Sequence, residues 1–454
     1  MKKRGLVFVI MAVLMTFTAC SSKQKKEPSD DTPWNHGYHA IMETEEGYYT
    51  NQVYPIRGTR TAQCLRYVEK NSKESIPLCN KPECDHVGGD KCEASYNNIE
   101  PLSTLLYDGA IYVLGVEYSG NNVAINMYRG ALDGSIMDKV GCVVQADNLR
   151  EEEVYTRPIN SPYLLLWGVL DESFIIHRGY AYIPYFLQIG KGAKGVKGQG
   201  ICRMNLSNGE TEEIYQTVNL SEGIPLRVTG VGDYVYFLIA ATGSSGKTKR
   251  YVISTKEVQN VVTTKENGKP GYEKPYFMFS EDRYYGLKRM EESNQLSITA
   301  YDAQTMQEVK EESFVIDDFS GDYAMDLVDA FLYDGMFVLG TRAKACFYDK
   351  QGAFLGEMDV DGIDHFSDPD EHFFLESYKI CNGKLYFLYN NRSSLWGGTI
   401  DVRDDVFFSN LIWQVYACPL EDIFQGRGEW EKAYSVEGRM TNDELMYYFQ
   451  MNLP

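Results

Sequence analysis

Histidine is scarce in this sequence, and basic residues are few relative to acidic ones. It has six histidines in 454 residues, and its 44 Lys and Arg against 64 Asp and Glu give a net charge of −20. A surface of this sign repels nucleic acid, and no basic run is dense enough to reverse that repulsion. The G-x-S-x-G nucleophile elbow is also absent. These absences argue against nucleic-acid binding and against a hydrolase module of the prolyl-peptidase kind.

Long stretches of helical periodicity are missing too, and strand-like repeats take their place. A turn built from Gly, Asp or Asn precedes an aromatic-rich apolar run seven times, at intervals of roughly 50 to 70 residues. The aromatic residues that anchor the seven copies are Tyr49, Tyr112, Tyr182, Tyr236, Tyr285, Phe337 and Tyr386. Such a period, with strand composition in each unit, is typical of radially repeated four-stranded sheets. One short helix is expected over 442–451, after the capping residue Thr441.

The repeats predict an all-β fold, a β-propeller of seven blades with four antiparallel strands each. Every aromatic run leads into an alternating apolar and polar stretch that turns through Asp-Gly, Asn-Gly or Gln-Gly. We expect the propeller to occupy 38–454, with blades near 38–98, 99–165, 166–222, 223–270, 271–320, 321–370 and 371–436 and a C-terminal extension. Six or eight blades, a β-sandwich or two separate β domains are the alternatives, because short strands have similar sequences in any sheet.

The first residues form a targeting segment rather than part of the fold. Lys2, Lys3 and Arg4 precede an apolar run over 5–17 that is too short to span a bilayer. The sequence Phe-Thr-Ala-Cys then ends at Cys20, which is the pattern of a bacterial lipoprotein signal peptide over 1–19. We therefore expect Cys20 to be lipidated and 20–37 to be a flexible polar tether. Ordinary secretion or an uncleaved anchor is the alternative, and both also place the chain outside the cytoplasm.

The lipobox, the repeated DG-x-I-Y strands and the phrase IPLCNKPECDHVGGDKCEA together suggest a relationship. With these features the chain resembles the uncharacterised β-propeller surface lipoproteins of Gram-positive anaerobes. The resemblance covers most of the mature chain, and the cysteine phrase is its most distinctive part. It implies a propeller anchored by lipid to the outer face of the cell membrane. It implies no chemistry, because no activity is established for that family.

Four potential metal ligands lie within the cysteine phrase. Cys79, Cys84, His86 and Cys92 follow the pattern C-x4-C-x-H-x5-C in a segment rich in Gly, Pro and Asp. Three thiolates and one imidazole are a known ligand set for structural Zn²⁺. Four protein ligands leave no open coordination position, so zinc here would hold the loop and not catalyse a reaction.

Disulfide bonds are the competing interpretation of this cluster in an exported protein. Cys64 and Cys79 lie on either side of a predicted hairpin turn and could pair, while Cys84 and Cys92 would close a small loop. Redox chemistry is a third possibility. The remaining cysteines lie singly in apolar strands and are expected to be buried thiols: Cys142, Cys202, Cys346, Cys381 and Cys418.

Three loops resemble binding motifs, and each has a simpler explanation. ATGSSGKT at 241–248 resembles a P-loop, but the β-branched stretch after it predicts a strand where phosphate binding requires a helix, so we expect no nucleotide. GKGAKGVKGQG at 190–200 could hold an anionic ligand through its lysines, yet it also fits a solvated hairpin tip. DVDGIDHFSDPDEH at 359–372 departs from the Ca²⁺-loop pattern at Ile363 and fits an acidic loop between blades.

The 34 tyrosines would suit carbohydrate stacking, but most lie at alternating strand positions and are expected to pack the core and the blades. His177, in an apolar strand, is expected to be structural rather than a catalytic base. The leading hypothesis is therefore a lipid-anchored module that binds a surface protein, peptide or glycan without catalysis. The alternatives are a glycan- or peptide-processing enzyme with carboxylates at the central channel, and a purely structural docking platform.

Overall fold

A computed structural model of the chain contains almost exclusively β-structure. It describes residues 40–56, 60–71, 75–79, 81, 99–119, 122–134, 137–146, 174–188, 196–217, 224–240, 247–261, 278–290, 295–317, 319, 327–341, 343–360, 374–390 and 406–441. The expected signal peptide, the expected tether and the expected helix over 442–451 lie outside this part. The described strands form seven sheets of four strands each.

The strands of the first four blades follow one another in chain order. Blade 1 contains β1 (Met42–Glu43), β2 (Gly47–Ile56), β3 (Arg60–Glu69) and β4 (Ser75–Pro77), and blade 2 contains β5 (Ile99–Tyr107), β6 (Ala110–Ser119), β7 (Asn122–Gly130) and β8 (Met137–Ala146). Blade 3 contains β9 (Ile175–His177), β10 (Tyr180–Gln188), β11 (Val196–Asn205) and β12 (Thr211–Thr217), and blade 4 contains β13 (Ile224–Val231), β14 (Tyr234–Ala240), β15 (Lys247–Val252) and β16 (Glu257–Asn260).

The last three blades repeat this order. Blade 5 contains β17 (Met278–Phe279), β18 (Arg283–Arg289), β19 (Leu296–Asp302), the 3-10 turn η4 (Lys310–Glu312) and β20 (Phe314–Ile316). Blade 6 contains β21 (Leu327–Tyr333), β22 (Met336–Thr341), β23 (Lys344–Tyr348) and β24 (Phe354–Asp359), and blade 7 contains β25 (Phe374–Cys381), β26 (Lys384–Asn390), β27 (Val406–Pro419), the helix α3 (Leu420–Phe424) and β28 (Glu431–Thr441). β28 extends to Thr441, beyond the blade limit expected near 436, because Thr441 still pairs with Val406 at the start of β27.

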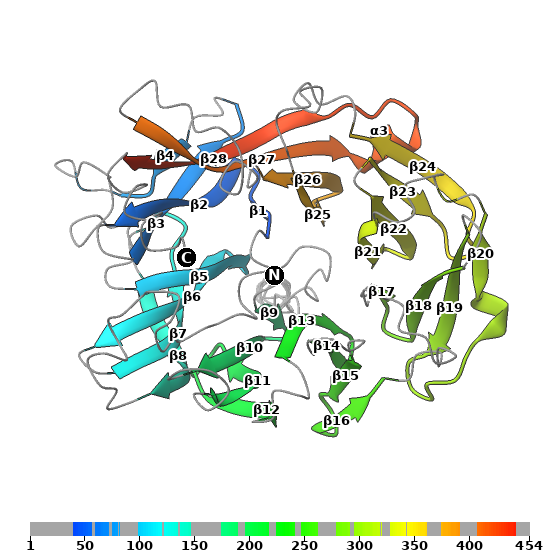
Figure 1. Cartoon of the computed structure of the whole chain (residues 1–454), viewed down its shortest axis with the longest axis horizontal. Helices are drawn as coiled ribbons and strands as arrows, with labels where there is room; N and C mark the ends of the chain where they lie inside the picture. The colour runs from blue at the N-terminus through cyan, green and yellow to red at the C-terminus, as the bar shows by residue number, and fades with distance from the viewer. Residues whose placement is uncertain are drawn as a thin grey trace, which may run out of the picture.

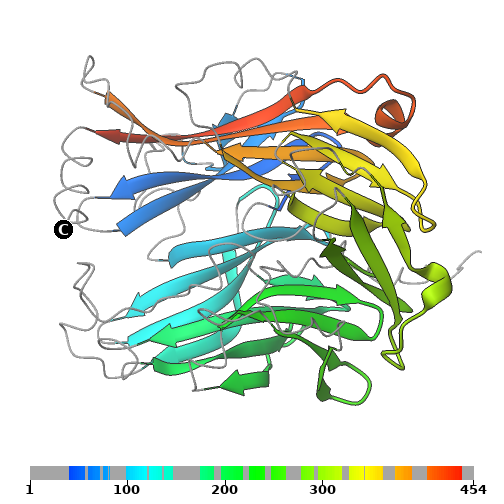
Figure 2. The same ribbon diagram turned by 45° about the vertical axis from the view of Figure 1, so that its right-hand side comes forward.

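The seven sheets surround a common centre, so the fold is a seven-bladed β-propeller, as the sequence predicted (Figure 1). The first strand of each blade lies nearest the centre and the fourth lies at the rim (Figure 1). The seven anchoring aromatics all fall on second strands. In Figure 2, as in Figure 1, the first blade lies beside the last, and this closes the ring.

Tight turns join the first and second strands of the blades. Asp108-Gly109, Arg178-Gly179, Asp334-Gly335 and Asn382-Gly383 have positive φ at both positions. This is the type I′ geometry, whose twist matches that of the flanking strands and which Asp-Gly and Asn-Gly favour. The turn residues recognised in the sequence therefore have a direct backbone role.

Aromatic side chains fill the spaces between blades, as expected from the alternation of tyrosines. Tyr236 of blade 4 is fully buried and stacks on Phe279 of blade 5, with ring centroids 3.9 Å apart. Between blades 5 and 6, Tyr285 meets Phe337 edge to face at 4.8 Å. One blade cannot bury both faces of its sheet alone, and these contacts supply the second buried face.

Candidate ligand-binding face

The two faces of the ring carry different kinds of connection. Because neighbouring strands are antiparallel, strands 1–2 and 3–4 of each blade are joined at one face, which we call the short-turn face. Strands 2–3 and successive blades are joined at the opposite face, which we call the long-loop face. β8 ends there at Ala146 and β9 begins there at Ile175, whereas two residues link β9 to β10 at the short-turn face.

Every loop that resembled a binding motif connects at the long-loop face. The lysine-rich segment joins β10 to β11, the P-loop-like segment joins β14 to β15, and the acidic segment follows β24. β15 begins at Lys247, so a strand and not a helix follows the P-loop-like sequence, as expected. The central residues of these loops lie outside the described part of the chain. The antiparallel order nevertheless brings their attachment points to one face.

The cysteine cluster does not begin at that face, because Leu78, directly before Cys79, lies against Gly134 in the β7–β8 turn of the short-turn face. Cys79 is half-buried and follows β4, the rim strand of blade 1. Cys84, His86 and Cys92 lie outside the described residues, as does Cys20. In the β3–β4 ladder Arg66 pairs with Pro77, and continuing that register would place Cys79 opposite Cys64. However, the Cys79 amide donates to the Pro77 carbonyl at 2.9 Å and turns the chain away from the ladder. The backbone thus leaves both the zinc and the disulfide interpretations open.

The short-turn face carries ion pairs that link neighbouring blades. Among the ion pairs of the described residues, the most deeply buried charged side chain is that of Glu43 at the end of β1, which is 1% exposed. Its carboxylate lies 2.8 Å from Lys70 of its own blade and 3.0 Å from Lys384 of blade 7. Asn382 of blade 7 also donates to it, at 3.1 Å. Glu43 therefore joins the first blade to the last.

Hydrogen bonding keeps Glu43 ionised despite its burial. Burial alone would raise the pKa of this carboxyl, but the hydrogen bonds and positive charges of Lys70 and Lys384 outweigh burial and lower the pKa below 4.5. A lowered native pKa stabilises the folded state at pH values above the unfolded pKa, and the contribution is lost as the pH falls through the native pKa. Glu43 therefore supports the closed ring throughout the neutral range.

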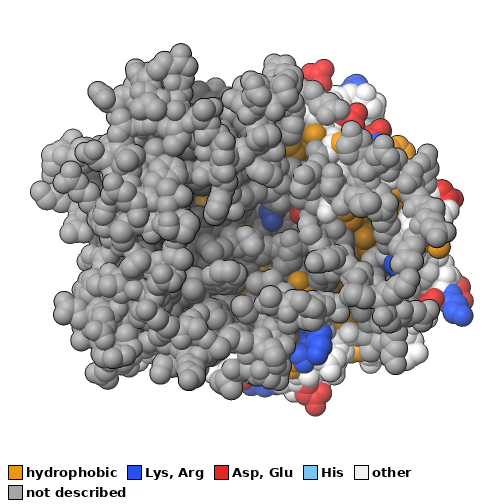
Figure 3. Space-filling model, viewed as in Figure 1, with side chains coloured by type: hydrophobic (Ala, Val, Ile, Leu, Met, Phe, Trp, Pro, Cys, Tyr) orange, Lys and Arg blue, Asp and Glu red, His pale blue; other side chains and the backbone are white. Residues whose placement is uncertain are grey.

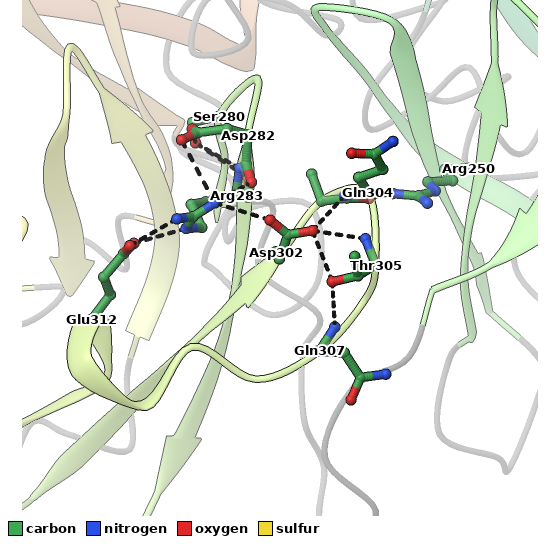
Figure 4. A network of polar contacts seen from close by, with 10 residues as sticks. Arg250, Ser280, Asp282, Arg283, Asp302, Gln304, Thr305, Gln307 and Glu312 are labelled. Atoms are coloured by element: carbon green, nitrogen blue, oxygen red, sulfur yellow. Dashed lines mark hydrogen bonds and ion pairs between the residues drawn. The ribbon is translucent and has the colours of Figure 1, made fainter.

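A second polar network lies in blade 5 (Figure 4). Arg283 donates two hydrogen bonds to Glu312, both 2.8 Å long, and one of 3.3 Å to Asp302. Asp302 in turn accepts hydrogen bonds from the backbone and hydroxyl of Thr305. From blade 4, Arg250 donates to the carbonyl of Ala303, so this network also lies at a junction between blades.

The two carboxyl groups of this network, those of Asp302 and Glu312, are not suited to act as general acids. Hydrogen bonds from Thr305 lower the pKa of Asp302, and those from Arg283 lower the pKa of Glu312. A general acid at neutral pH needs a raised pKa, which burial without a cationic partner provides. These carboxylates are paired and ionised, so their role is to hold the turns of the blade.

The isolated cysteines are only partly as expected. Cys202, Cys346 and Cys418 are buried, but Cys142 and Cys381 are half-buried, which corrects the expectation for these two. They differ because Cys142 lies on a rim strand and Cys381 lies at the end of an inner strand beside a turn. Burial raises the pKa of Cys202, Cys346 and Cys381 to about 12. Thiols with raised pKa values are poor nucleophiles, so these three do not suit redox chemistry.

His177 occupies a buried position between two blades, which fits a structural role. Its ring is fully buried on β9, and its Nε2 lies 2.8 Å from the carbonyl oxygen of Gly232 in blade 4. A Cβ at Gly230 would lie 2.5 Å from the histidine ring, so this glycine makes room for it. His177 therefore contributes to the junction between blades 3 and 4, as expected.

Sequence reasoning did not identify Glu43, Lys384 or Arg283. One signal was present for Glu43, because it is a charged residue that directly ends the apolar run at 40–42. Its partner Lys384 lies 341 residues away in the sequence, so no local pattern could connect the two.

The described residues include neither a metal-binding cluster nor a membrane-spanning helix. Within the ranges given above, no group of three or more His, Cys, Asp and Glu is arranged to hold a metal ion. In the same part of the chain, no helix has the length and apolar character to cross a membrane. In the space-filling view, the described acidic and basic side chains are interspersed along the right-hand rim (Figure 3).

No protein-family model and no curated protein matches this sequence. Among solved structures, a prolyl endopeptidase is similar over 92% of this chain and 51% of its own, with 9% identity and a TM-score of 0.49. The β-propeller domain of the Trilobed protease from Pyrococcus furiosus is similar over 90% and 98%, with 10% identity and a TM-score of 0.39. An oligogalacturonate lyase is similar over 80% and 91%, with 11% identity and a TM-score of 0.42. The chain thus spans about half of the prolyl endopeptidase, and likenesses at these identities concern the fold alone.

Proposed function

We propose that this protein is a lipid-anchored, extracytoplasmic β-propeller that binds a surface protein, peptide or glycan through its long-loop face without catalysing a reaction. The observation that carries the proposal is the division between the faces. The lysine-rich, P-loop-like and acidic loops attach at one face, whereas the other is formed by the tight strand 1–2 turns and by the strand 3–4 connections, two of which contain η4 and α3. Rigid scaffolds that present variable loops at one edge are a common basis for recognition.

The short-turn face supports this assignment because several of its charged side chains pair with one another. Arg178 of blade 3 lies 3.8 Å from Asp233 of blade 4, and Lys256 lies 3.8 Å from Glu212 across the same junction. Together with the Glu43 and Arg283 networks, these pairs connect turns rather than offer groups to a ligand. The short-turn face thus stabilises the junctions between the blades, and these blades carry the loops of the opposite face.

The absence of catalysis is favoured by the carboxyl groups. Among the described residues, the carboxyls whose pKa is shifted are Glu43, Asp302 and Glu312, and all three shifts are downward. A glycosidase pair needs one carboxyl with a raised pKa to protonate the leaving group. The enzymatic alternative therefore requires groups beyond those described.

Site-specific photo-crosslinking on intact cells tests which face binds. Matched exposed positions are available at both faces: Gln145, Asn260 and Asp317 near the long-loop face, and Ser207, Gln304 and Lys350 in turns of the short-turn face. With a photoreactive residue at each position in turn, we expect adducts at least tenfold more abundant from the first set. Mass spectrometry then identifies the attached component as protein, peptide or glycan.

Equal adduct yields from the two faces, or a higher yield from the short-turn face, would contradict the assignment. Conversion of the captured component by the wild-type protein, at a rate proportional to protein concentration, would instead support the enzymatic alternative.

We further propose that Cys79, Cys84, His86 and Cys92 bind a structural Zn²⁺ that fixes the connection between blades 1 and 2. Cys79 directly follows Leu78, which packs against Gly134 of blade 2, so the start of this connection is already anchored between the two blades. A closed site of three cysteines and one histidine would order the remainder of the connection.

Elemental analysis of protein purified without chelators checks the metal. We expect about one zinc per chain in the wild type, none in Cys84→Ser, and an unchanged content in the control Cys142→Ser. Absence of zinc from the wild type, together with a disulfide-linked Cys64–Cys79 peptide in non-reduced digests, would establish the competing interpretation.

A further inference from the structure

The junction between blades 7 and 1 differs from the other six in its covalent structure. All seven described sheets consist of four strands that are consecutive in the sequence, so blades 1 and 7 share no described strand. Each of the other junctions is also crossed by the connection that leads from one blade to the next. At the 7–1 junction, β2 and β28 lie side by side without such a connection (Figures 1 and 2).

Noncovalent contacts alone therefore close the ring within the described part of the chain. Tyr48 of blade 1 packs against Tyr386 and Tyr434 of blade 7, with ring centroids 6.4 Å and 5.1 Å apart. Ile41 lies in the same apolar cluster, and Cys381 of blade 7 packs against that cluster. The Sγ of Cys381 is 4.0 Å from the carbonyl oxygen of Ile41.

Glu43 is the polar centre of this junction. Its buried carboxylate bridges Lys70 of blade 1 and Lys384 and Asn382 of blade 7, whereas the two lysines remain about one-third exposed. Removing one member of a buried ion pair is costly because its partners lose their counter-charge. When the junction separates, Glu43 loses the two contacts with blade 7 but keeps Lys70.

We propose that the ring opens locally at the junction between blades 7 and 1, and that Glu43 is the latch that holds it closed. Opening here stretches no connecting segment, so its free energy is set only by noncovalent contacts. At every other junction the chain continues from one blade to the next, and between blades 3 and 4 only residues 218–223 separate β12 from β13. Opening would give an extended ligand a sideways route to the inner strands, and it is independent of which face of the ring binds.

Hydrogen–deuterium exchange of the full chain tests the latch. Glu43→Gln keeps the shape of the side chain and removes its charge. We expect it to speed amide exchange at least tenfold in β1, β2 and β28, with little change in β13–β20. The matched control is Glu357→Gln, which removes a carboxylate 2.6 Å from Lys344 within blade 6 and should leave the 7–1 junction unaffected.

Two results would overturn the proposal. One is an equal increase of exchange in all seven blades of Glu43→Gln, which would mean that the ring unfolds as a unit. The other is no change in any blade, which would mean that Glu43 is not the latch.

If Glu43→Gln does not fold, a cross-link replaces it. Ile41→Cys introduces a thiol beside Cys381, and oxidation by a disulfide reagent removes two protons and two electrons from the two thiols as the S–S bond forms. We expect the oxidised form to exchange at least tenfold more slowly at the 7–1 junction than its reduced form, with β13–β20 unchanged. Equal exchange in the two forms would contradict local opening.

Discussion

Replacing Cys20 by serine should release the protein from the membrane. Lipid-modified cysteine is the only anchor that we expect, because the apolar run over 5–17 is too short to span a bilayer and the net charge of −20 repels anionic lipid. We expect the wild type almost entirely in the membrane fraction. The Cys20→Ser protein should shift by more than tenfold toward the soluble fraction or the medium, as measured by immunoblotting of fractionated cells.

The matched control for this experiment is Cys142→Ser, which removes a half-buried thiol from a rim strand and should stay with the membrane. Detergent phase partition of the wild type should also place it in the detergent phase. If Cys20→Ser instead remains in the membrane fraction, the N-terminal segment acts as an uncleaved anchor or another part of the chain binds the membrane.

Truncating Tyr236 should cause a large loss of stability. Its ring is fully buried between blades 4 and 5, where it stacks on Phe279 at 3.9 Å and lies 6.4 Å from Tyr284. Removing a buried aromatic side chain costs about 3–5 kcal/mol, because contacts are lost and the cavity closes only partly. We expect Tyr236→Ala to lower the free energy of unfolding by about that amount, measured by urea denaturation.

Tyr236→Phe separates the ring from the hydroxyl. Because it keeps the stacking surface, it should retain most of the stability that the alanine variant loses. A loss of less than about 1 kcal/mol in Tyr236→Ala would show that the aromatic contacts between blades contribute little to the ring.

The architecture could be predicted because its determinants are local. The Asp-Gly and Asn-Gly pairs at 108–109, 334–335 and 382–383 have positive φ at both positions between the first and second strands of their blades, so each reports a hairpin by itself. The aromatic residues that follow mark the second strand of each blade. Seven copies of one local signal therefore predict seven blades without knowledge of any contact between them.

The candidate sites could be predicted less well. The loops at 190–200, 241–248 and 359–372 were recognised as separate segments, and nothing in their sequences indicated that they attach to a common face. Their attachment to a common face follows only from the number of antiparallel strands that separate the loops along the chain. The partial exposure of Cys381 was likewise missed, because its apolar neighbours in the sequence gave no sign of the adjacent turn.

Sequence alone predicted a ring of seven four-stranded sheets, since strand alternation and turn chemistry are encoded within about ten neighbouring residues, and the structure decided against six or eight blades. Only the tertiary structure decided how the ring closes. Glu43 and Lys384 are 341 residues apart, and their ion pair exists because the first and last blades meet after all the others have been placed. A contact between the ends of a circular arrangement depends on the sum of all the angles between its blades, which no local pattern specifies.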